Sequence, residues 1–84
     1  MRKITDFLKE VEGLFNIKID PTAKDSISRS AKYVFVKSCL EYGIELIELK
    51  EFFGHKKTET LRLFVLRYNP SIIELEMIKK IVNL

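Results

Sequence analysis

Apolar residues recur at three- and four-residue spacing along most of the chain, which is the period of an amphipathic α-helix. Short segments with glycine, proline or asparagine interrupt this pattern, and these residues commonly end helices. The pattern predicts five helices, with approximate bounds 3–15, 27–42, 46–53, 57–68 and 72–83. We therefore expect an all-α fold, a small helical bundle of about five helices, in a single domain that spans residues 1–84.

The second expected helix is apolar on an unusually wide face, because two stripes of apolar residues run along it. A helix of this kind is contacted on several sides, so we expect it at the centre of the bundle. Over the whole chain, the apolar stripes predict a core that includes Phe7, Leu8, Val11, Val34, Phe35, Leu46, Leu49, Phe53, Leu61, Val65 and Ile78.

Several residues carry the signals of helix ends. Asp20–Pro21 can start a helix, with the aspartate as N-cap and the proline in the first turn, and Ser26 is a second candidate cap. Ser71 and Glu74 have the spacing of a capping box, in which each side chain bonds to the backbone amide of the other residue. Gly54 is expected to end the third helix, since glycine readily adopts the left-handed conformation needed just past a C-terminus.

The segment 46–68 has the pattern of a helix-turn-helix. A helix of about two turns is followed by Gly54, a short basic turn and a second helix, which in DNA-binding proteins of this kind lies in the major groove. Residues 55–69 carry a net charge of +3, residues 41–54 carry −3, and residues 21–40 again carry +3. Phosphate contacts require clustered lysine and arginine, so this distribution favours DNA binding.

Composition narrows the class of protein. The chain has one His, one Cys and no spacing typical of a metal site or a phosphate-binding glycine loop. We therefore expect no metal ligands, no cofactor and no catalytic residues, and hence no enzyme. Cys39 lies in an apolar helical pattern, which predicts a buried structural thiol in a reducing cytoplasm. No apolar run approaches the roughly 18 residues that span a bilayer, so no membrane partner is expected.

Two stretches carry a resemblance to a known family. Ala31–Lys32 stands where the family's long helix opens on an Ala-Arg pair. The segment ELIELKEFFG follows the family pattern Ser-Leu-x-Glu-Ile-Gly-x-x-Phe-Gly, with matches at Leu46, Glu48, Leu49, Phe53 and Gly54. From Ser28 to Arg67 the chain thus resembles the C-terminal DNA-binding domain of the bacterial replication initiator DnaA, and small stand-alone relatives of it in phages and mobile elements. The resemblance implies a TrpR-like helix-turn-helix and a cytoplasmic location, in the host if the protein is phage-encoded.

The family's next segment is Gly-Arg-Asp-His-Thr-Thr-Val, in which the Asp-His-Thr steps read bases. The corresponding segment here, His55–Leu61, is HKKTETL, with Lys56 in place of the arginine and a matching Thr60. Residues 57–59 depart from the three base-reading steps, so we expect a different DNA sequence to be recognised.

Together these features predict a small DNA-binding protein of replication or transcription control, with double-stranded DNA as its partner. Lys32, carried over from the family's arginine, would reach the minor groove or a phosphate. Lys50, His55 and Lys56 are expected to hold phosphates around the turn. The residues expected to face base edges, thymine methyls or nearby phosphates in the major groove are Lys57, Thr58, Glu59, Thr60 and Arg62.

An alternative function belongs to another class. The same fold can act as a protein–protein adaptor, or as an inhibitor of a replication or transcription protein, without binding DNA. The acidic third helix and the altered base-reading segment favour this alternative. The last expected helix has two apolar stripes, and one of them needs a surface beyond a single core, which favours a homodimer or another protein partner.

Overall fold

The computed structural model describes residues 1–84 as five α-helices without any strand. The helices are α1 (Ile4–Phe15), α2 (Ser26–Tyr42), α3 (Leu46–Phe53), α4 (Thr58–Arg67) and α5 (Ile72–Val82). The expected all-α bundle of five helices is confirmed, and every expected bound lies within one residue of the observed one.

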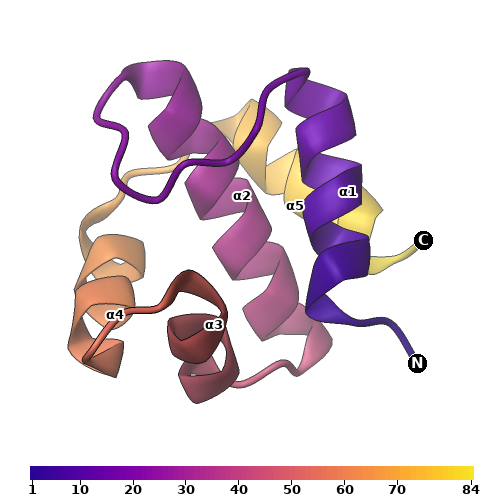
Figure 1. The fold of residues 1–84 in the computed structure, drawn as a ribbon. Helices are drawn as coiled ribbons and strands as arrows, with labels where there is room; N and C mark the ends of the chain where they lie inside the picture. The colour runs from indigo at the N-terminus through magenta and orange to yellow at the C-terminus, as the bar shows by residue number, and fades with distance from the viewer.

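Helix α2 lies at the centre of the molecule, with α1 and α5 on one side of it and α3 and α4 on the other (Figure 1). It contacts α1, α4 and α5. All residues from Ala31 to Val36 are buried, as are Ser38 and Cys39. A helix with a single buried face cannot bury so many consecutive positions, so α2 is enclosed around its whole circumference along this stretch.

Every predicted core residue lies in the observed core or packs against it, and the core also contains Ala31, Tyr33, Val36, Cys39 and Ile81. Four of the predicted residues, Leu8, Leu46, Phe53 and Val65, are partly buried and pack against its rim. The others are at most 2% exposed, and they are Phe7, Val11, Val34, Phe35, Leu49, Leu61 and Ile78. The helical period alone therefore located the apolar faces that meet inside the molecule.

Helix α2 is capped by neither of the residues that the sequence suggested, although its first residue is Ser26. Its N-cap is Asp25, whose carboxylate accepts a hydrogen bond from a first-turn amide at 3.0 Å, so the predicted start at Asp20–Pro21 and the predicted cap at Ser26 are both wrong. The Asp20 carboxylate instead accepts bonds from the amide and hydroxyl of Thr22, at 2.9 and 2.7 Å. An aspartate that bonds to its own backbone two residues ahead closes a turn in place of a helix.

Glycine ends both α2 and α3. The φ angles are 115° at Gly43 and 73° at Gly54, in the left-handed region that other residues rarely adopt. The Gly54 amide donates to the Glu51 carbonyl at 3.1 Å. The next amide, that of His55, donates to the Lys50 carbonyl at 3.0 Å. These bonds satisfy the last carbonyls of α3 and redirect the chain toward α4.

The capping box at the start of α5 is confirmed and extends into a wider network. The Ser71 amide donates to Glu74 Oε1 at 2.7 Å, and the Glu74 amide donates to the Ser71 hydroxyl at 3.2 Å. The second oxygen, Glu74 Oε2, accepts bonds from the hydroxyls of Ser30 and Tyr68. One buried carboxylate thus joins α2, the end of α4 and the start of α5.

The charge state of Glu74 is set by two opposing effects. Burial raises the pKa of the carboxyl, but hydrogen bonds from Ser30, from the Ser71 amide and from Tyr68 together outweigh burial and lower it. A carboxyl whose pKa is lowered in the folded state stabilises the fold above the unfolded-state pKa. That contribution is lost as the pH falls through the lower, folded-state pKa.

We expect Leu49→Ala to lower the free energy of unfolding by about 2–5 kcal/mol, because the leucine is fully buried and the cavity cannot collapse completely. Urea denaturation measures this change. The matched control is Ile47→Ala on the same helix, where the side chain is 48% exposed and the expected change is about 0.5 kcal/mol or less. Equal effects of the two substitutions would contradict the assignment of α3 to the core.

We expect Glu74→Gln to destabilise the protein at about pH 7, because the charged acceptor of three hydrogen bonds is lost. The difference from the parent protein should shrink as the pH falls below the ordinary carboxyl value of 4.5, where the parent loses the same charge. Urea denaturation at a series of pH values tests this. Glu76→Gln, at an exposed position of the same helix, should show no such pH-dependent difference.

Candidate nucleic-acid interface

The third and fourth helices form the helix-turn-helix that the sequence pattern predicts. Residues 54–57 connect α3 to α4, the two helices contact each other, and α4 also contacts α2. Leu49 of α3 and Leu61 of α4 are fully buried, so both helices are held by the core. Figure 1 shows α4 on the side of the molecule away from α1, with the turn and its own N-terminal end at the periphery.

The N-terminal end of α4 is open and basic. Its N-cap residue, Lys57, makes no side-chain capping bond, so the first amides of the helix have no side-chain partner there. Lys56 and Lys57 are exposed, as are Glu59, Thr60 and Arg62, while Thr58 is half-buried. An open helix N-terminus flanked by lysines attracts anions, because both the amides and the helix dipole favour negative charge.

Two of the predicted base-reading residues are paired with each other. Arg62 donates to the Glu59 carboxylate at 3.2 Å, and both side chains are more than half exposed. An exposed pair of this kind contributes about 0–1 kcal/mol, so DNA can separate its partners at little expense.

Lys32 is not on the surface where DNA contact was expected. The residue is 8% exposed, its ammonium donates to the Pro21 carbonyl at 3.2 Å, and its Nζ lies 4.4 Å from the centroid of the Phe64 ring. Burial, and secondarily the charge of Arg29, lower the pKa of the Lys32 ammonium. The physical reason is the enclosure of α2, which turns the whole stretch 31–36 inward. In this structure the Lys32 ammonium is occupied by the Pro21 carbonyl and the Phe64 ring.

His55 and Lys50 are also less accessible than the other predicted phosphate contacts, since both are half-buried. His55 packs its ring against Phe53, with 5.7 Å between centroids, and its Nε2 is buried without a hydrogen-bond partner. The ring therefore closes the turn against α3, and its Nε2 is not presented to a ligand. The predicted site residues that the structure does bring together are those of 56–62.

Two arginines that the sequence analysis did not single out border one face of α4. Arg29, near the start of α2, and Arg67, in the last turn of α4, line one shallow depression together with Thr60, Leu63 and Phe64. The spacing of Thr60, Leu63 and Arg67 could have revealed a stripe along α4. Arg29 is 38 residues from Arg67 in the chain, so only the packing of α4 on α2 shows that it belongs there.

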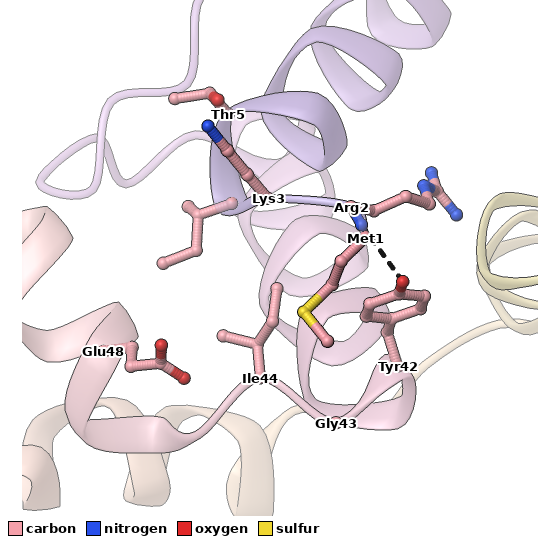
Figure 2. A pocket seen from close by; sticks show the side chains of 9 residues that line it. Met1, Arg2, Lys3, Thr5, Tyr42, Gly43, Ile44 and Glu48 are labelled. Atoms are coloured by element: carbon pink, nitrogen blue, oxygen red, sulfur yellow. Dashed lines mark hydrogen bonds between the residues drawn. The ribbon is translucent and has the colours of Figure 1, made fainter.

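Another hollow, of about 570 Å³, lies between the N-terminal segment, the end of α2 and the start of α3 (Figure 2). The Arg2 amide donates to the Tyr42 hydroxyl at 3.1 Å, and the Arg2 side chain points away from the hollow. Its guanidinium donates to the Ile81 carbonyl at 2.6 Å and lies over the Phe7 ring. The Arg2 guanidinium is therefore held outside the hollow, whose remaining polar side chains are those of Lys3, Thr5, Tyr42 and Glu48.

Three further observations concern the thiol of Cys39, metal binding and membrane spanning. Burial raises the pKa of the Cys39 thiol to about 12, so this predicted buried thiol is a poor nucleophile. No cluster of three or more His, Cys, Asp or Glu side chains is placed to hold a metal ion. None of the five helices is long and apolar enough to cross a membrane.

Comparisons of the chain with protein-family models, with curated proteins and with solved structures give no match. The structure defines a small all-α protein with a helix-turn-helix whose second helix has an open, basic N-terminal end.

We expect Lys32→Met to leave both DNA affinity and its salt dependence unchanged, because the buried ammonium is occupied by the Pro21 carbonyl. At about pH 7 the variant should be at least as stable as the parent, since burying a charge without a carboxylate partner is unfavourable. The lowered pKa means that the folded parent sheds its proton at lower pH than the unfolded chain. The parent therefore gains stability as the pH approaches 10.5, and the advantage of the methionine variant should shrink there. Urea denaturation at both pH values, with anisotropy on DNA, measures these effects.

Proposed function

We propose that this protein binds duplex DNA through the N-terminal half of α4 and the basic turn before it, in the control of replication or transcription. The observation that carries the proposal is the open N-terminus of α4, with exposed Lys56 and Lys57 beside it and buried Leu49 and Leu61 behind it. A rigidly held, positively charged helix end is the element that a helix-turn-helix inserts into the major groove. Such a role requires the compartment that holds the DNA, which for a bacterial or phage protein is the cytoplasm.

The exposed residues divide into two roles. Lys56 lies in the turn, ahead of the helix, and suits a phosphate contact that fixes the position of the protein. Lys57 and Arg62 suit guanine, Thr58 and Thr60 suit thymine methyls or phosphates, and Glu59 suits the amino group of cytosine. Binding then exchanges the Glu59–Arg62 ion pair for contacts to base edges. The resemblance to the DnaA C-terminal domain supports this placement, although residues 57–59 depart from its base-reading steps.

We expect Lys56→Ala to weaken binding to all duplex sequences and to flatten the plot of log affinity against log salt by about one unit, because one phosphate contact is lost. Fluorescence anisotropy across a salt series measures both. Lys9→Ala removes an equally exposed lysine from α1, on the other side of the molecule, and should leave the slope unchanged. Substitutions at Lys57, Glu59 or Arg62 should instead alter the order of preferred sequences.

A failure of the parent protein to bind duplex DNA at low salt would refute the DNA-binding proposal. At about 50 mM salt, non-specific binders still hold DNA. If the parent protein shows no association with duplex DNA under that condition at tens of micromolar, the DNA-binding proposal is refuted. The protein–protein adaptor or inhibitor then becomes the function to pursue.

The adaptor alternative is favoured by one observation of its own. Large apolar side chains are exposed from the last turn of α4 into the first turn of α5, with Leu66 at 70%, Ile72 at 75% and Ile73 at 72%. Ile73 lines one open hollow with the exposed Leu14 and Ile27, and apolar groups gathered in this way commonly mark a surface that meets another protein. This surface does not overlap the basic residues 56–62, so a protein partner and DNA do not exclude each other.

We expect the protein to form a homodimer at micromolar concentration, with the exposed apolar residues of α5 at the contact. Sedimentation equilibrium should show a species heavier than the 9.9 kDa monomer. Ile72→Glu should return it to monomer without lowering thermal stability, because the side chain is not part of the core. A parent protein that sediments only as the monomer would contradict this expectation.

A further inference from the structure

The depression beside α4 has the composition of an anion site. Thr60, Leu63 and Arg67 line it from α4, Arg29 closes it from α2, and its volume is about 390 Å³. No acidic side chain lines it. Arg29 is exposed, and its guanidinium carbon lies 6.0 Å from the centroid of the Tyr68 ring, at the end of α4.

Both arginines lack a counter-ion. The ion pairs of the structure are Lys37–Glu41 and Glu59–Arg62, and neither involves this depression. Two guanidinium groups that line one depression repel each other, and an anion bound between them would attract both. A phosphate suits the place best, because the planar guanidinium donors match its oxygens and the Thr60 hydroxyl can add a further bond.

We propose that Arg29, Thr60 and Arg67 bind a backbone phosphate of the DNA, on the opposite wall of the major groove from Lys56. This inference rests on the proposed function and adds a second, separate phosphate contact to it. The 10 residues of α4 rise about 15 Å from the turn lysines to Arg67. The major groove is about 12 Å wide, so Lys56, ahead of α4, and Arg67, at its end, can reach the two strands while Lys57, Glu59 and Arg62 face the bases between them.

The test is a salt series of DNA affinity for the double variant Arg29→Ala with Arg67→Ala. Its slope should be flatter than that of the parent by about one unit, since one phosphate contact is lost. The double variant Arg29→Lys with Arg67→Lys keeps both charges and should restore the parent slope. Lys9→Ala with Lys80→Ala removes two exposed lysines from α1 and α5 and should have no effect. Circular dichroism and thermal melts confirm that each variant is folded.

The outcomes separate this inference from the proposed function. If the parent binds DNA and Lys56→Ala flattens the slope, but the double alanine variant keeps the parent slope, the second phosphate contact is refuted and the proposed function stands. If the parent binds no DNA, the proposed function fails, and a titration with inorganic pyrophosphate followed by amide NMR decides the site. If pyrophosphate changes the amide chemical shifts of Thr60, Leu63 and Arg67 in the parent protein but not in the double alanine variant, the depression is an anion site. If it changes none of them in the parent protein, the anion site is refuted.

Discussion

The complete enclosure of α2 is the constraint from which the rest of the structure follows. Because the stretch Ala31–Val36 is buried on every side, α1 and α5 must cover one face while the pair α3–α4 covers the other. Tyr33 stacks on Tyr68 with 4.3 Å between ring centroids, which holds the end of α4 against α2. Phe35 meets Phe53 at 5.7 Å, which holds the end of α3. The basic face of α4 therefore points outward because its apolar face is committed to α2.

Enclosure also brings polar groups inside. Two charged side chains find partners that the fold supplies, whereas the hydroxyl of the buried Ser38 has no hydrogen-bond partner. Lys32 finds the Pro21 carbonyl and the face of the Phe64 ring. Glu74 finds the hydroxyls of Ser30 and Tyr68. The Lys32 side chain joins α2 to α4, and the Glu74 carboxylate joins α2 to the end of α4 and to α5. The proposed DNA-binding element is therefore packed as one unit with the core. Substitutions at these places are expected to act on DNA binding only through stability.

The two flanks of α4 differ in a way that bears on recognition. Along one flank Arg62 is already neutralised by Glu59, so the proposed base contacts there would require an exchange of partners. Along the other, Arg67 is without a counter-ion and lies close to Arg29. This division suits the proposed DNA binding. The unpaired arginine would add affinity through a phosphate, and the weak ion pair could open so that its side chains contact bases and set the sequence preference. It also explains why net charge alone was a poor guide to which cations are free.

The sequence by itself determined the number, bounds and inner faces of the helices, because the helical period and the glycines at 43 and 54 act locally. It also located the capping box at Ser71, since that motif depends on residues three apart. The sequence did not predict the features that form where two distant segments of the chain meet. Lys32 looked like a surface cation until the packing of α3 and α4 covered it, and Arg29 joined Arg67 only through the contact of α2 with α4. Accessibility and charge pairing are properties of packed surfaces, so only the tertiary structure could decide which basic residues are free to meet a ligand.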